Sequence, residues 1–282
     1  MHCIGIDLGT TNSLVSYWDE TEGKVKLIPN EFGDTLTPSV VGFPKGAGVL
    51  VGKAAKEMLI NEPDRAFREF KRDMGTKTKY RVDRKSYLPE ELSSFVLRQL
   101  KQDAEAYFGE PVDEAVISVP AYFTDKQRCA TRVAGQLAGL SVKRIINEPS
   151  AAALSYHVDR MADHAVYLIS DFGGGTLDIS IVEAFDNIVQ HILQCLIKSS
   201  GIDKRCPEHI HVHPWIIPER KQRCIHILDI DLCLLQILRG KPLKRINKDC
   251  RIIRNHDVRH QCIIIFNFLQ PSFSDQPVQN PC

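Results

Sequence analysis

The residues best suited to chemistry in this chain are two aspartates, Asp7 and Asp171, each at the end of an apolar run. The turn after the first contains Gly9, Thr10, Thr11 and Asn12, and the turn after the second contains Gly173, Gly174, Gly175 and Thr176. A second alternating apolar run follows each turn. Both segments therefore predict a strand, a tight turn and a strand, with a carboxylate at the end of the first strand.

These residue types suit a phosphate and its metal ion. Glycine lets the backbone approach a ligand closely and present its N–H groups to phosphate oxygens, and threonine adds hydroxyl donors. A terminal aspartate can hold hydrated Mg²⁺, which prefers carboxylate, water and phosphate oxygens. Two such hairpins facing each other would hold a nucleoside triphosphate from both sides, although two ordinary hairpins would show the same pattern. The chain has no G-x-x-x-x-G-K-[ST] motif, which argues against a Walker-type site.

The composition is that of a soluble globular protein. The chain has 282 residues, 43% of them hydrophobic and 25% charged, and a net charge of +1, which favours no nucleic-acid partner. The N-terminus lacks the basic and apolar segments of a signal peptide. The longest apolar stretch near the C-terminus, Ile225–Leu238, carries two aspartates and is too short and too charged to span a membrane. We expect a cytoplasmic protein with reduced cysteines and no membrane association.

The composition changes abruptly near residue 190. Residues 191–282 contain seven of the nine cysteines and no alanine, although alanine is common in helices and cores. Three interpretations compete: a separate domain, a metal-binding module, or an out-of-frame or rearranged translation appended to a shortened gene product. His209, His211 and His213 would share one face of a strand, which suits a metal ion, but the cysteines show no ligand spacing. We favour the third interpretation and expect a poorly ordered tail.

Residues 1–190 carry clear strand and helix patterns. The expected strands are the first hairpin at Cys3–Tyr17, then Lys24–Ile28, Thr37–Phe43, Val49–Gly52, Glu114–Val119, Val142–Ile146 and Ala165–Asp171. The expected helices are Lys53–Asn61, Pro63–Phe70, Pro89–Phe108, one between the capping box Thr124–Gln127 and Gly139, and one with Pro149 in its first turn. This order predicts a mixed sheet with helices packed against it.

Five motifs occur in a fixed order along these residues. They are Gly5–Ser13, Phe70–Gly75, Val119–Arg128, Asn147–Ala153 and Asp171–Asp178. Together they resemble the nucleotide-binding domain of the 70-kDa heat-shock chaperones, whereas actins and sugar kinases share the two hairpins but not this combination. The segments Lys71–Gly75 and Pro89–Glu105 are most similar to the HscC-type members. The resemblance covers residues 1–190 and implies an α/β, actin-like ATPase (ribonuclease H-like) fold, with the first lobe complete and the second only begun.

The resemblance also implies roles for single residues. Asp7 and Asp171 would hold Mg²⁺ through water, and ATP or ADP would bind to Asp7, Gly9, Thr10, Thr11, Asn12, Gly173, Gly174, Gly175, Thr176 and Asp178. The catalytic residues would be Lys71, Glu148, Asp171 and Thr176, which place a cation at the γ-phosphate and position the attacking water and the transferred group. Pro120 and Arg128 would form the switch that carries the nucleotide state to a substrate domain.

Each of these residues also has an ordinary structural interpretation. Lys71 could be a solvated surface charge, Glu148 a carboxylate at a helix start, and Pro120 the end of a strand. Asp178 could simply lie on a hairpin face. Only the joint occurrence of the five motifs favours the functional interpretation of each residue.

The expected domains are a first lobe at 1–165 with an inserted subdomain at about 36–87, the start of a second lobe at 166–190, and the tail at 191–282. The family continues with nucleoside contacts and a peptide-binding domain that the tail does not resemble. We therefore expect an ATP-binding, ATP-hydrolysing domain of an ATP-dependent protein-folding chaperone in truncated form, with weak or absent turnover. The alternative is a non-catalytic remnant or interaction protein. A J-domain co-chaperone and unfolded clients are the implied partners, with client binding in doubt.

Overall fold

The computed structural model describes residues 2–155, 164–172, 176–185, 188–198, 250–254 and 262–268. The chain divides into two compact units. The first consists mainly of Met1–Ala151, and the second consists mainly of the chain from Ala152 on. None of the described helices is both long enough and apolar enough to cross a lipid bilayer.

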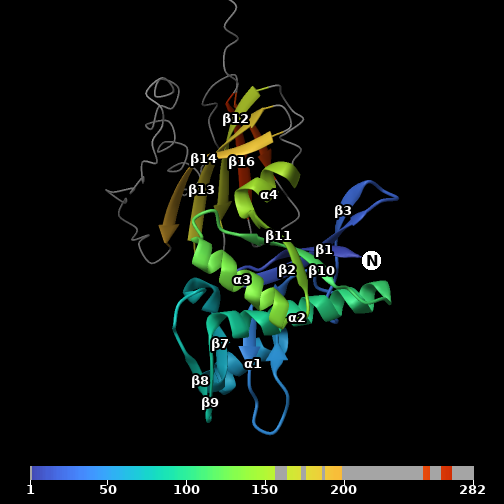
Figure 1. The fold of residues 1–282 in the computed structure, drawn as a ribbon, viewed down its shortest axis with the longest axis vertical. Coiled ribbons are helices and arrows are strands. Elements are labelled where there is room, and N and C mark those ends of the chain that lie inside the picture. The colour runs from blue at the N-terminus through green and yellow to red at the C-terminus, as the bar shows by residue number, and fades with distance from the viewer. Residues whose placement is uncertain are drawn as a thin grey trace, which may run out of the picture. The chain divides into compact units, whose positions relative to one another are not determined.

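A six-stranded mixed sheet forms the centre of the first unit (Figure 1). Its strands are β1 (Cys3–Asp7), β2 (Asn12–Asp19), β3 (Lys24–Leu27), β4 (Thr37–Pro38), β10 (Glu114–Val119) and β11 (Ser141–Asn147). The main order is β11-β10-β1-β2-β3, and β4 pairs with β2. Strands β1, β10 and β11 are parallel, so their carboxyl ends meet at one edge, where Asp7 lies opposite Ser118 and Val119 lies opposite Asn147. This edge carries the candidate site.

Helices α2 (Pro89–Phe108) and α3 (Asp125–Leu137) pack against each other and against strands of this sheet (Figure 1). Helix α2 forms where the sequence predicts it, because apolar side chains recur every four residues on one stripe. Leu92, Val96, Leu100 and Ala104 are all buried in the core of the unit. Gly109 ends the helix in the left-handed conformation, with φ of 69°, that glycine adopts without strain.

Helix α3 begins at the predicted capping box. The Thr124 hydroxyl accepts a hydrogen bond from the Gln127 amide, and the Gln127 side chain accepts one from the Thr124 amide at 2.9 Å. On the inner face of the helix, a Cβ atom on Gly135 would lie 2.3 Å from Cγ2 of Val142 on β11. The absence of a side chain at this position therefore lets α3 lie close against the strand that precedes Glu148.

A small subdomain is inserted between β4 and α2. It contains β5 (Val40–Gly42), β6 (Leu50–Val51), α1 (Lys53–Asn61), the 3₁₀ turn η1 (Pro63–Arg65), β7 (Ala66–Arg68), the 3₁₀ turn η2 (Phe70–Asp73), β8 (Tyr80–Val82) and β9 (Lys85–Tyr87). The prediction of a helix at Pro63–Phe70 is wrong. Only one 3₁₀ turn forms there, and the chain then extends to pair with β5 as strand β7. A non-local strand pairing has overridden a short helical pattern.

Aromatic rings and one arginine hold this subdomain together. Phe43 stacks on Tyr87 at 4.6 Å between ring centroids and meets Phe67 at 5.9 Å. Nε of Arg65 donates to the carbonyl oxygen of Phe43 at 2.6 Å, and its two terminal nitrogens donate to the carboxylate of Asp83 at 2.7 and 2.6 Å. This contact fixes the β8–β9 hairpin against the rest of the subdomain.

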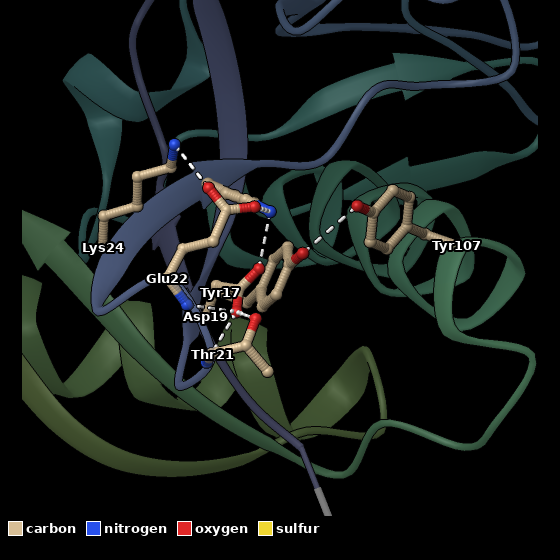
Figure 2. A network of polar contacts seen from close by, with 7 residues as sticks. Tyr17, Asp19, Thr21, Glu22, Lys24 and Tyr107 are labelled. Carbon is tan, nitrogen blue, oxygen red and sulfur yellow. Dashed lines mark hydrogen bonds and ion pairs between the residues drawn. The ribbon is translucent and has the colours of Figure 1, made fainter.

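A polar network organises the turn between β2 and β3 (Figure 2). The carboxylate of Asp19 accepts hydrogen bonds from the amide of Thr21 at 2.9 Å and from that of Glu22 at 3.2 Å, and it pairs with Lys26 at 2.6 Å. The ammonium of Lys26 and the neighbouring donors hold the pKa of Asp19 well below its ordinary value. On β2 itself, the Tyr17 hydroxyl lies 3.2 Å from that of Tyr107, which links the strand to α2.

The second unit contains a five-stranded sheet of order β14-β13-β12-β16-β15. Its strands are β12 (His164–Phe172), β13 (Thr176–Phe185), β14 (Ile188–Lys198), β15 (Cys250–Arg254) and β16 (Cys262–Phe268). Helix α4 (Glu148–Ser155) precedes it in the chain and starts at the predicted position. One part of the tail, strand β16, therefore pairs with β12. Most of the tail, including His209, His211 and His213, lies outside the described residues, and its expected disorder stays a prediction.

Candidate functional site

The turn between β1 and β2 is built so that only glycine fits at its start. A Cβ atom on Gly9 would lie 2.0 Å from the carbonyl oxygen of Asn12, closer than any real contact. Thr10 is half-buried and Thr11 is exposed, so the turn presents threonine residues at the surface of the unit. The tight turn is consistent with the glycine that the sequence places there, whereas its binding of phosphate stays a prediction.

Asp7 is positioned by its parallel neighbour. It is the last residue of β1 and lies in register with Ser118 of β10. The hydroxyl of Ser118 donates to Oδ1 of Asp7 at 2.9 Å. Ser118 is buried and Asp7 is half-buried, so this hydrogen bond is partly shielded from water and orients the carboxylate.

Lys71 and Glu148 form a buried ion pair at the same edge. Nζ of Lys71 donates to Oε1 of Glu148 at 2.8 Å, and the side chains are 8% and 16% exposed. Lys71 comes from η2 of the inserted subdomain, and Glu148 is the first residue of α4, directly after β11. The ammonium also lies 5.8 Å from the centroid of the Phe123 ring. Burial excludes the interpretation of Lys71 as a solvated surface charge.

The electrostatics of this pair depend on Asp7 as well. Burial by itself would lower the pKa of Lys71, but the negative charges of Glu148 and Asp7 outweigh it, and the pKa of the ammonium is raised. Burial raises the pKa of the Glu148 carboxyl; the Lys71 cation opposes that shift, and the charge of Asp7 adds to it. A protonated lysine is therefore held next to two carboxylates in a partly desolvated place, and the net negative charge of the three groups suits an additional cation.

Arg128 and Pro120 lie in one hydrogen-bonded segment of the first unit. The guanidinium of Arg128 donates to the carbonyl oxygens of Phe123 at 3.0 Å and Ala121 at 3.1 Å, and to Oδ1 of Asn147 at 2.7 Å. Pro120 is buried, and its carbonyl oxygen accepts from the amide of Phe123 at 3.0 Å. The geometry links Arg128 to Asn147, the neighbour of Glu148, and Pro120 to Phe123, whereas the action of Pro120 and Arg128 as a switch stays a prediction.

The second hairpin is present in the second unit. Strands β12 and β13 pair antiparallel from His164 opposite Phe185 to Phe172 opposite Leu177, and Asp171 lies opposite Asp178. Asp171 is half-buried and Asp178 is buried. Gly173, Gly174 and Gly175 lie outside the described residues, and of Thr176 only the backbone, at the start of β13, is described. Because this hairpin belongs mainly to the other unit, a shared site with Asp7 stays a prediction.

The sequence assigns no role to several polar residues that the structure places around the candidate site. Ser118 and Asn147 are single polar residues at strand ends, and Ser39 lies in a short segment that the sequence marks only as a strand. The one available signal is that Ser118 lies next to the end of the predicted strand Glu114–Val119, and that Asn147 directly follows the predicted strand Val142–Ile146. Among the described residues, no group of three or more histidine, cysteine, aspartate or glutamate side chains could hold a metal ion by itself.

Comparisons with known proteins agree with this geometry. The family model described as Hsp70 protein matches residues 3–86 and 76–193. The chaperone protein DnaK of Thermotoga neapolitana is 51% identical over 189 residues, which are 67% of this chain and 32% of that protein. DnaK of Thermosipho melanesiensis is 49% identical over 191 residues, 68% of this chain and 32% of that protein. The chain belongs to the Hsp70 family, and it spans about a third of the length of these relatives.

The family match confirms the resemblance that the five motifs indicate, together with the α/β ATPase-domain fold that it implies. It ends at residue 193, within a few residues of the change in composition near residue 190. The relatives quoted are DnaK proteins, and a closer kinship with HscC-type members stays a prediction.

Proposed function

We propose that the first unit provides the phosphate- and Mg²⁺-binding side of the ATP-binding, ATP-hydrolysing domain of an Hsp70-type protein-folding chaperone. The observation that carries this proposal is the buried Lys71–Glu148 pair, electrostatically coupled to Asp7. A buried cation beside two carboxylates leaves this place with a net negative charge, which favours a metal cation that would in turn hold a phosphate anion. The glycine turn between β1 and β2 lies directly after Asp7 and offers amide donors to such an anion.

The residues present fit a hydrated Mg²⁺ ion. Asp7 is half-buried, and its carboxylate is held by Ser118, which leaves it oriented as a fixed oxygen ligand. Bound Mg²⁺ would neutralise charge on the phosphates. Lys71 would balance charge at the γ-phosphate, and Glu148 would orient the attacking water and accept its proton. In the second unit, Asp171, Thr176, Asp178 and the turn at 173–175 would complete the set, as family resemblance implies.

We further propose that turnover by this chain is weak or absent. The family match ends at residue 193, and the resemblance assigns most of the adenosine contacts to sequence beyond that point. Loss of several contacts of roughly 1–1.5 kcal/mol each weakens binding by orders of magnitude. By the same resemblance, a J-domain co-chaperone and unfolded clients are the partners and the cytoplasm is the location. Client binding would need the remaining two thirds of the relatives' length.

Calorimetric titration with MgADP and MgATP tests the binding proposal, and single-turnover hydrolysis tests the chemistry. Lys71→Ala should abolish binding of both nucleotides, because it removes the buried cation from the phosphate side of the site. Lys79→Ala is the matched control, since Lys79 is exposed in the same subdomain. If folded wild type binds neither nucleotide at millimolar concentration, the alternative of a non-catalytic interaction protein replaces the proposal. Turnover at the rate of a complete family ATPase domain would contradict the expected weak activity.

A further inference from the structure

We propose that Ser39 is a positioning residue that holds the phosphate-binding turn of the first hairpin in its working shape. This inference rests on the proposed function and concerns the same site. Ser39 belongs to the inserted subdomain, between β4 and β5, yet it makes its hydrogen bonds to the turn that follows β1. It touches no catalytic group and would act only through the backbone of that turn.

Three hydrogen bonds join Ser39 to the first hairpin. Its hydroxyl donates to the carbonyl oxygen of Gly9 at 2.7 Å, and its amide donates to the carbonyl oxygen of Thr11 at 2.8 Å. The hydroxyls of Ser13 and Ser39 lie 2.9 Å apart. A hydroxyl has one proton, and that of Ser39 is used on Gly9, so the Ser13 hydroxyl donates to Ser39. The two hydrogen bonds therefore run in one direction, from the Ser13 hydroxyl to the Ser39 hydroxyl and from there to the Gly9 carbonyl oxygen.

The hydrogen-bonded group of Ser13, Ser39 and Gly9, called the brace below, is buried. Ser13 is 0% exposed and Ser39 is 2% exposed. A buried hydroxyl or carbonyl without a partner is costly, and no solvent can replace a lost partner here. The buried network thus favours one arrangement of the turn over the others.

The local fold explains why Ser39 is available for this contact. Strand β4 pairs with β2 only through Asn12 opposite Pro38 and Ser13 opposite Thr37. Continued by one residue, this antiparallel register places Ser39 opposite Thr11, so the Ser39 amide makes the next hydrogen bond of the ladder, to the Thr11 carbonyl.

The orientation of two amide groups follows from these contacts. In a trans peptide the C=O and N–H groups of one unit point in opposite directions, and the described residues contain no cis peptide. The Gly9 carbonyl points to Ser39, so the amide of Thr10 points away from it. The Thr11 carbonyl also points to Ser39, so the amide of Asn12 points away as well. Ser39 therefore aims two N–H donors away from the buried brace, as recognition of phosphate oxygens requires.

Three variants test the brace. Ser39→Ala removes the hydroxyl and leaves the Gly9 carbonyl without its donor. Ser93→Ala is the matched control, because Ser93 is 0% exposed and its hydroxyl donates to the Pro89 carbonyl at 2.8 Å within α2, outside the turn. Ser13→Ala removes only the outer donor and should have a smaller effect than Ser39→Ala. It also keeps the test decisive if Ser39→Ala does not fold.

The first measurement needs no nucleotide. Hydrogen exchange should show protection of the residue-39 amide falling roughly five- to tenfold more in Ser39→Ala than in Ser93→Ala. The amide chemical shifts of Thr10 and Asn12 should change only in Ser39→Ala and Ser13→Ala. Equal protection and unchanged shifts in Ser39→Ala and Ser93→Ala would overturn the brace. If Ser39→Ala does not fold, unchanged shifts in Ser13→Ala would have the same meaning.

The second measurement is affinity for MgADP by calorimetry. Ser39→Ala should bind roughly fivefold or more weakly than Ser93→Ala. Equal affinities would overturn the role of Ser39 at the phosphate site. If wild type does not bind MgADP, the proposed function fails, and the exchange data still decide whether Ser39 shapes the turn.

Discussion

Arg128 and Asn147 are joined by a hydrogen bond of 2.7 Å from a guanidinium nitrogen to the side-chain oxygen, which ties helix α3 to the end of strand β11. The same guanidinium holds the carbonyl oxygens of Ala121 and Phe123 in the segment after β10. Asn147 directly precedes Glu148 in the chain. The planar side chain of Arg128 therefore joins the end of β11, directly before Glu148 of the buried ion pair, to the segment after β10.

Replacing Arg128 with lysine should show that the planar fork, and not the charge, is required. Arg128→Lys keeps the cation but cannot make three directed hydrogen bonds at once, so we expect a loss of about 1–3 kcal/mol in the free energy of unfolding. Urea denaturation measures it. Arg132→Lys, at an exposed position of the same helix, should change stability by less than about 0.5 kcal/mol. Equal effects of the two substitutions would contradict this role for Arg128.

Breaking the buried pair from one side should cost more than removing it entirely. Lys71→Met leaves Glu148 buried beside Asp7 without its cation, and we expect a destabilisation of about 3–5 kcal/mol. In the double variant Lys71→Met with Glu148→Gln the unpaired charge is gone, and most of that loss should be recovered. The four free energies of a double-mutant cycle give the coupling. Additive effects of the two substitutions would mean that the pair is not coupled.

Glycine should be required at position 9 for steric reasons alone. A Cβ atom there would lie 2.0 Å from the Asn12 carbonyl oxygen, so Gly9→Ala must displace the turn. We expect at least about 2 kcal/mol of destabilisation by thermal or urea unfolding. Gly48→Ala is the control, because a Cβ atom at Gly48 meets nothing within 4 Å and its φ is not in the left-handed region. A stable Gly9→Ala variant with an unchanged turn would refute this explanation.

A buried carboxyl on α2 should make stability depend on pH. Asp103 is 7% exposed; Gln99 donates to its Oδ1 at 3.0 Å, and no described residue donates to Oδ2. Burial, with the negative charge of Glu31, raises the pKa of Asp103 above its ordinary value of 3.8. The folded state then holds the proton more tightly than the unfolded state, so stability falls as pH rises from about 3.8 through the folded-state pKa.

Asp103→Asn removes that titration. The variant should be more stable than wild type at pH 7 by about 1–2 kcal/mol, and the difference should vanish near pH 3, where both side chains are neutral. Urea midpoints between pH 3 and pH 7 measure the trend. Asp113→Asn, at an exposed position, should show no such pH-dependent gain. A pH-independent difference for Asp103→Asn would show that the buried charge is not its cause.

The sequence predicts long, self-contained elements well. Helix α2 has its observed bounds because one stripe of apolar residues, a proline at its start and Gly109 at its end agree with each other. The segment Pro63–Phe70 was predicted wrongly because its conformation depends on pairing with β5. The β8–β9 hairpin was not predicted, since its short strands carry little apolar alternation and its turn contains no glycine.

The site was predictable only in part. The turn at Gly9 follows from residue types, because tight turns and phosphate contacts both need glycine. The pairing of Lys71 with Glu148 spans 77 residues, has no local signal and is not predicted by the sequence; the family resemblance implies only a separate role for each residue. The hydroxyls of Ser39 and Ser118 were not predicted, since a buried serine has the same sequence signature as an exposed one. Their roles depend on strand register, which residue types alone do not specify here.

The parallel pairing of β1 with β10 sets the order in which this protein can assemble on the ribosome. Asp7 and Ser118 are 111 residues apart in sequence, so β1 must wait for that length of chain to be synthesised. At about 5–20 residues per second, the delay is roughly 6–22 seconds. During this delay β1 can pair only with β2. The other edge of β1 exposes unpaired backbone groups that can pair with a strand of another chain. A member of a chaperone family thus begins its own synthesis as a nascent chain prone to mispairing.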